Sequence, residues 1–122
     1  MQFAAFNGRE NVLSVLLDGG ANPDGGGSTR VPIYWAAKGG SASCVRILID
    51  HGAQINKPEK YGENALMVAS KKGYTDVVDV LVRNNADVRA KDVDGNTALD
   101  IAKLYSKHAV VQYFLSNTNI TD

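Results

Sequence analysis

Few side chains in this chain of 122 residues have the types that enzyme chemistry uses most. There is one thiol, Cys44, and there are two imidazoles, His51 and His108. Thiols and imidazoles act as nucleophiles, as acid–base groups and as zinc ligands, but only where several such groups converge. The two histidines have no metal-ligand spacing to each other or to the cysteine. We therefore expect no catalytic residues, no metal site and no cofactor, and we do not expect an enzyme.

A glycine triplet, Gly25 to Gly27, raises the possibility of phosphate chemistry, because glycine-rich loops can bind phosphate with backbone amides. The triplet is not followed by the Gly-Lys-Ser/Thr that completes a phosphate-binding loop, and no strand is expected before it. We interpret it as a turn.

The overall composition limits the classes of partner. Thirteen Lys and Arg balance thirteen Asp and Glu, so no global field draws the chain to nucleic acid or to a membrane. A hydrophobic content of 44% is typical of a globular chain with a core. No apolar run approaches the ~20 residues that span a bilayer, and a single cysteine forms no internal disulfide. We expect an intracellular protein, in the cytoplasm or the nucleus, with no membrane insertion.

The chain is internally repetitive. The block Ala-Ala-x-x-Gly begins at Ala4, returns at Ala36, and returns again as Ala-Ser-x-x-Gly at Ala69, in steps of 32 and 33 residues. An apolar column keeps the same spacing: Leu16, Leu48, Leu81 and Phe114. Such a period is typical of stacked repeats. The sequence predicts a single domain of about four units, over residues 1–24, 25–57, 58–90 and 91–116, with a loose tail over 117–122.

Each unit is predicted to contain two short helices and a loop. Pro32 suits the first turn of a helix, and Thr97 is a suitable N-cap residue for another. Second helices are expected at about 11–18, 43–51, 75–84 and 108–116, each with apolar residues at helical spacing. Small residues on the first helices and large ones on the second predict a curved stack, with Cys44 and the Leu16, Leu48 and Leu81 column buried between units.

Two stretches carry a resemblance to a known family. The segment 60–67 reads Lys-Tyr-Gly-Glu-Asn-Ala-Leu-Met, and 92–100 reads Asp-Val-Asp-Gly-Asn-Thr-Ala-Leu-Asp. With the Ala-Ala-x-x-Gly blocks, they resemble the ankyrin repeat over about residues 3–116. The resemblance implies an all-α repeat solenoid of stacked helix-turn-helix units with projecting β-hairpin loops. The family's Thr-Pro-Leu-His motif has no histidine here: its place is taken by Tyr34, Met67 and Asp100.

The resemblance further implies a non-catalytic protein–protein interaction module, such as an adaptor, a scaffold or a regulatory subunit. Its partner is expected to bind the concave groove and the hairpin tips, where Gly27 and Ser28 also fall. The predicted partner-binding residues are Phe6, Arg30, Lys38, Lys60, Tyr61, Glu63, Lys71, Lys72, Asp94, Asn96, Leu104 and Tyr105. Because the middle of this groove is rich in lysine and arginine, the expected partner is a protein with an acidic or mixed polar surface.

Three alternatives stay open. Lys38, Lys71 and Lys72 could instead form a stripe that binds a phosphate-containing ligand or nucleic acid, although zero net charge argues against nucleic acid. The positions equivalent to Trp35 in the other repeats hold apolar residues, so we interpret Trp35 as a packing residue rather than an exposed anchor. The first unit lacks an opening turn and leaves Phe3 uncovered, as expected either of a short cap or of a piece of a longer array.

Overall fold

The four predicted units appear as four pairs of helices in the computed structural model, which describes residues 1–26 and 30–117. The first helices of the pairs are α1 (Gln2–Phe6), α3 (Pro32–Lys38), α5 (Ala65–Lys72) and α7 (Ala98–Leu104). The second helices are α2 (Glu10–Asp18), α4 (Ala42–Asp50), α6 (Thr75–Arg83) and α8 (His108–Asn117). One short 3-10 turn, η1 (Lys60–Gly62), lies in the loop before α5. Gly27, Ser28 and the tail from 118 onward lie outside the described residues.

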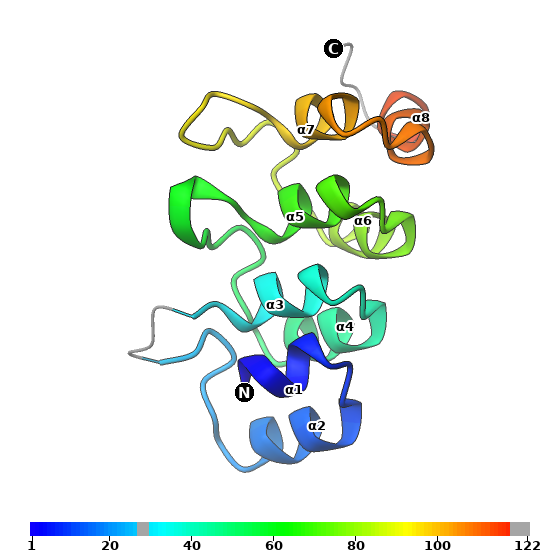
Figure 1. The fold of residues 1–122 in the computed structure, drawn as a ribbon. Coiled ribbons are helices and arrows are strands. Elements are labelled where there is room, and N and C mark those ends of the chain that lie inside the picture. Colours follow the sequence, from blue (N-terminus) through cyan, green and yellow to red (C-terminus); the bar gives the residue numbers. More distant parts are fainter. Residues whose placement is uncertain (27–29, 118–122) are drawn as a thin grey trace.

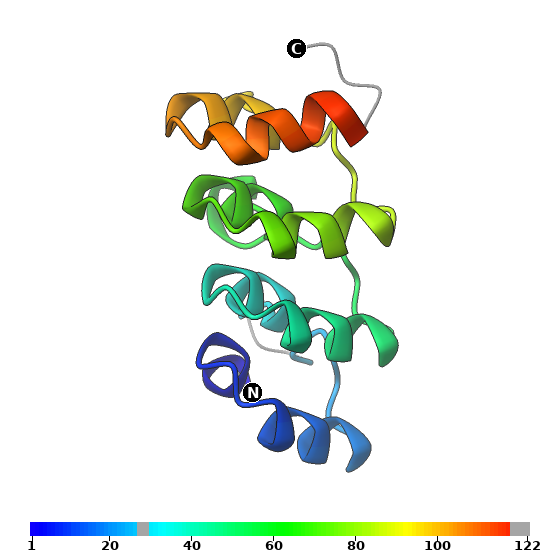
Figure 2. The same cartoon turned by 90° about the vertical axis from the view of Figure 1, so that its right-hand side faces the viewer.

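The pairs stack in chain order. First helices pack on first helices and second helices on second helices, so the array has a loop side and a second-helix side (Figure 1). Turned by 90°, the second helices lie one above another toward the viewer (Figure 2). The predicted helical solenoid is confirmed. In the described part of the chain the projecting loops carry no regular strand, and they are closed as turns, for example by the bond from the Glu59 amide to the Glu63 carbonyl at 2.8 Å.

Local sequence explains where the helices begin and end. Pro32 occupies the first turn of α3, where its missing N–H leaves no bond unmade. Thr97 and Asp100 form a reciprocal capping box at α7, with bonds of 3.0 and 3.2 Å. Gly52 and Asn85 follow α4 and α6 with φ of 90° and 69°, the left-handed conformation that glycine and asparagine adopt most readily.

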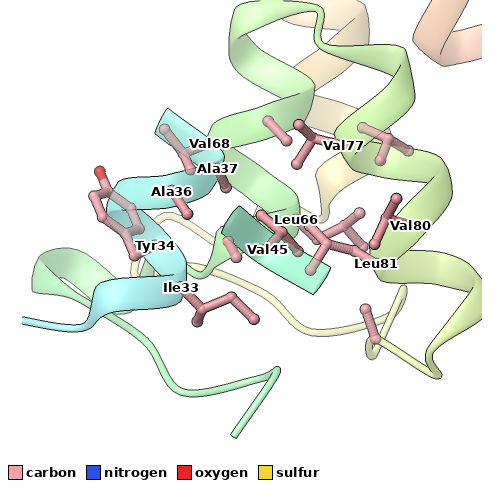
Figure 3. Packing of buried hydrophobic residues seen from close by; sticks show 14 of the residues in the cluster. Ile33, Tyr34, Ala36, Ala37, Val45, Leu66, Val68, Val77, Val80 and Leu81 are labelled. Carbon is pink, nitrogen blue, oxygen red and sulfur yellow. The ribbon is translucent and has the colours of Figure 1, made fainter. Parts of the chain in front are cut away.

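The core lies between the helix layers (Figure 3). Ala36 and Ala37 are fully buried on α3, and their small side chains let the first helices approach closely. The same approach explains Gly39, because a Cβ atom there would overlap the carbonyl oxygen of Phe6 at the end of α1. Larger side chains such as Val77 and Leu81 on α6 fill the space between the pairs.

The first unit departs from the predicted burial. Leu48 and Leu81 are 0% exposed, as predicted, but the prediction that Leu16 is buried is wrong, since it is 40% exposed. On α2 the buried side chains are instead Leu13 and Leu17. Leu48 and Leu81 lie on helices that pack against an earlier second helix, whereas α2 packs only against the following one, α4. Among the described residues nothing covers the preceding edge of α2, so the Leu16 column is buried only from the second unit onward.

Candidate functional site

Two neighbouring hollows lie on the loop side, which is formed by the first helices and the loops before them. The larger, here called the C-terminal hollow, has a volume of about 570 Å³. The smaller, the central hollow, has a volume of about 370 Å³ and lies one unit toward the N-terminus. Lys60, Tyr61 and Glu63 line both, so the loop around η1 forms a wall between the hollows.

Most of the predicted partner-binding residues line one or both hollows. The central hollow contains Arg30, Lys38, Lys60, Tyr61 and Glu63. The C-terminal hollow contains Lys60, Tyr61, Glu63, Lys71, Asp94, Asn96, Leu104 and Tyr105. Two predicted residues line neither. Lys72 is exposed at the end of α5, and Phe6 touches the central hollow only through Trp35, with ring centroids 5.9 Å apart.

The C-terminal hollow exposes large apolar side chains. Tyr61 and Leu104 are 75% and 67% exposed, and Val93 and Tyr105 are exposed beside them. The ammonium group of Lys71 lies 5.3 Å from the centroid of the Tyr105 ring. Large apolar side chains gathered with a cation are typical of surfaces that bind proteins.

The loops around this hollow are held together by their own backbone. Tyr61 adopts a left-handed conformation with φ of 61°, and its carbonyl accepts the amide of Val93 from the next loop at 2.9 Å. Gly62 permits this contact, because a Cβ atom there would lie 3.3 Å from the Cα atom of Asp92. The exposed Tyr61 ring is therefore presented by a loop that is fixed to its neighbour.

Trp35 lines the central hollow and contacts two of its cationic side chains. The Arg30 guanidinium and the Lys38 ammonium lie 5.3 and 4.9 Å from the centroid of its ring, distances typical of cation–π contacts. The ring also packs edge-on against Phe6 and Tyr34. Trp35 is half-buried, so it both packs and lines the hollow. The spacing of Trp35 and Lys38, three residues apart on one helix, was a signal available in the sequence.

The carboxylates of the central hollow already accept hydrogen bonds from the chain itself. Glu59 accepts the amide of Val31 at 2.6 Å and the indole N–H of Trp35 at 3.0 Å, and Glu63 accepts the hydroxyl of Tyr34. Sequence reasoning missed Glu59, because its partners lie 24 and 28 residues away and no local spacing marks them. Burial and the bond to Glu63 raise the pKa of Tyr34, so its hydroxyl stays a donor.

The two hollows differ in charge. The central hollow contains three cationic side chains and two carboxylates, whereas the C-terminal hollow contains two lysines and three carboxylates. Across the described ranges, Lys38, Lys60 and Lys71 take part in no ion pair. The ionisable side chains of the central hollow therefore carry one more positive than negative charge, and those of the C-terminal hollow one more negative than positive charge.

A sequence profile of ankyrin repeats in three copies matches residues 1–92. The chain belongs to the ankyrin-repeat family. Among its relatives are the ankyrin repeat and KH domain-containing protein mask of Drosophila melanogaster, 36% identical over 102 residues and 81% of this chain, and the human ankyrin repeat and KH domain-containing protein 1, 35% identical over 100 residues and 80% of this chain. A third is the B-cell lymphoma 3 protein homolog of Mus musculus, 32% identical over 105 residues and 84% of this chain. The chain spans only 2%, 4% and 23% of these three proteins, respectively.

Ankyrin repeats are generally protein-binding units and are generally not catalytic. In this ankyrin array the residues that replace the family's histidine have structural roles. Tyr34 bonds to Glu63 of the next unit, and its ring lies at the rim of the core with the hydroxyl pointing away from it (Figure 3). Asp100 completes the capping box of α7, and Met67 is buried. The Tyr34 bond thus supplies one polar link between units.

The thiol and the imidazoles of this ankyrin array are distributed over α4 and α8. Cys44 is fully buried in α4, and burial raises the pKa of its thiol. His51 caps the C-terminus of α4, where the carbonyl of Ile47 and the carboxylate of Asp18 face its two ring nitrogens at 2.9 and 3.0 Å. His108 begins α8.

Residues 1–26 and 30–117 contain no group of three or more His, Cys, Asp or Glu residues arranged to hold a metal ion. No helix among them combines the length and apolar character that crossing a membrane requires.

Proposed function

We propose that this ankyrin array is a non-catalytic docking module, acting as an adaptor, a scaffold or a regulatory subunit, whose partner protein binds the two hollows of the loop side. One observation carries the proposal: exposed aromatic and aliphatic side chains gather beside lysines that form no ion pair with any described residue, on a face whose loops are bonded to each other. A face fixed in this way loses little conformational entropy when a partner binds. We place the protein inside the cell, in the cytoplasm or nucleus.

The charge balance supports a partner with an acidic group at the central hollow. Glu59 and Glu63 are engaged by Trp35 and Tyr34, while Lys38 keeps its ammonium donors beside the Trp35 ring. A carboxylate of the partner that reaches Lys38 gains a charge-assisted hydrogen bond. The rest of the contact is apolar or mixed, as the C-terminal hollow is.

The experiment that tests the proposal compares two charge reversals, Lys38→Glu and Lys72→Glu. Both lysines end a first helix, so each reversal perturbs its helix terminus similarly, but only Lys38 lines a hollow. Proteins captured from cell extract by the wild-type chain and by the two variants are quantified side by side, and thermal melting checks folding. We expect Lys38→Glu to lose the captured partner and Lys72→Glu to keep it. Retention by both folded variants would refute docking at the central hollow.

Measuring how salt affects the captured complex distinguishes protein docking from the alternative, which is binding of a phosphate-containing ligand or nucleic acid. Polyanion binding releases counterions, so the logarithm of the binding constant falls linearly with the logarithm of the salt concentration. The slope is set by the number of phosphates that the protein contacts. Docking in the hollows predicts a shallow salt dependence and no competition by inorganic phosphate or a random oligonucleotide. Steep salt dependence together with competition would replace protein docking as the function.

A further inference from the structure

We infer that the two hollows together recognise one extended peptide segment of the partner, which carries an acidic side chain and a large apolar side chain about three residues apart. This inference rests on the proposed docking function and adds to it the chemistry and the spacing of the ligand. The acidic side chain occupies the central hollow, and the apolar side chain occupies the C-terminal hollow.

The assignment of the apolar side chain follows from exposure and charge. In the C-terminal hollow Leu104, Val93 and Tyr105 are exposed next to Tyr61, so a large apolar side chain bound there removes apolar surface of both partners from water. Carboxylates outnumber lysines in this hollow, so an acidic side chain is disfavoured there.

The assignment of the acidic side chain follows from the central hollow. Its cations outnumber its carboxylates, and both carboxylates already accept hydrogen bonds from the chain. Lys38 has no ion-pair partner among the described residues, and its ammonium is held over the Trp35 ring, which limits the side-chain entropy lost when a carboxylate binds.

The distance between the two bound side chains follows from the repeat. The hollows lie one unit apart, and the helices of adjacent units pack about 8–10 Å from axis to axis. An extended chain rises about 3.3 Å per residue, so about three residues connect the two hollows. A helical ligand rises only about 1.5 Å per residue and needs about six or seven residues for the same span. Tyr61 lines both hollows and is 75% exposed, so a helix about 10–12 Å across has less room beside it than an extended chain.

The test is selection from a random library of displayed short peptides on the wild-type chain, on Lys38→Gln, on Leu104→Ser and on the control Lys72→Gln, with melting used to confirm folding. We expect the wild type and the control to select an acidic and a large apolar residue three positions apart. Lys38→Gln should lose only the acidic preference, and Leu104→Ser only the apolar one.

A selected peptide is then titrated while the fluorescence of Trp35, the one tryptophan of the chain, is followed. We expect a change in emission on binding, and a loss of affinity of about tenfold or more when the spacing is lengthened to seven. A seven-residue preference, a basic preference, or unchanged Trp35 emission would overturn the inference. If no peptide is selected while Lys38→Glu still abolishes partner capture, the inference is wrong and the docking function stands. If no peptide is selected and Lys38→Glu also retains the captured partner, the docking function is wrong as well.

Discussion

Two leucines at the same place in successive units provide a direct test of the packing. Leu48 on α4 is 0% exposed, whereas Leu16 on α2 is 40% exposed, because only Leu48 has an earlier unit against it. Replacing each with alanine removes the same atoms from two environments. The structure therefore predicts unequal losses of folding free energy from an identical chemical change.

The magnitudes follow from burial. Leu48→Ala leaves a cavity between α2, α4 and their neighbours, and a buried Leu→Ala change costs about 2–5 kcal/mol. Leu16→Ala opens no enclosed cavity. The substitution removes about three carbons, and burying one such carbon fully contributes about 0.8 kcal/mol to the free energy of folding. Leu16 is 40% exposed, so about three-fifths of this contribution is present, and the expected cost is about 1–1.5 kcal/mol.

The assay is urea unfolding followed by circular dichroism and by Trp35 fluorescence, with linear extrapolation to water. Repeat arrays can unfold unit by unit, so the two probes must give the same midpoint before the free energies are compared. A loss for Leu16→Ala as large as that for Leu48→Ala would refute the reasoning, since it would mean that the preceding edge of α2 is covered in solution.

Three further predictions concern caps, protonation and close packing. Thr97→Ala removes the capping box of α7 and should cost about 1 kcal/mol in the free energy of unfolding, whereas Thr97→Ser should cost far less. The bond to a backbone carbonyl and then the bond to Asp18 raise the pKa of His51 above 6.5, so its stabilising contribution is complete below pH 6.5 and is lost as pH rises through the raised value. The melting temperature of His51→Gln should fall below that of the wild type in mildly acidic buffer and match it in alkaline buffer; a constant gap would contradict this. Gly39→Ala places a Cβ atom against the Phe6 carbonyl and should lower the melting temperature, whereas an unchanged value would mean that α1 packs less closely than described.

Much of the fold could be predicted because the repeat encodes it locally. A spacing of 32 and 33 residues, a proline at the start of α3 and glycine or asparagine after the second helices each have a local physical meaning, and the structure confirms them. The burial of Leu16 was mispredicted for a non-local reason. The prediction assumed that residues at the same position of every repeat are equally buried, which requires a neighbouring unit on both sides. The first described unit has a neighbour only on the following side.

The candidate site was less predictable, because it depends on contacts between units. The sequence predicted one groove with a basic middle and apolar or aromatic ends, and the structure has two hollows of opposite charge balance. Arg30 and Asp94 produce this difference, since Arg30 lines only the central hollow and Asp94 only the C-terminal hollow, whereas Glu59 and Asp92 add one carboxylate to each. The role of Trp35 was only partly visible, because its repeat position suggests packing and only the helical spacing to Lys38 indicates a cationic neighbour.

The measurement that tests the central claim most directly is site-specific photo-crosslinking in cells. A photoreactive amino acid replaces Tyr61, on the wall between the hollows, or Arg46, exposed on α4 on the second-helix side. Docking in the hollows predicts a discrete protein adduct from position 61 and none from position 46. An adduct from position 46 alone would contradict the account.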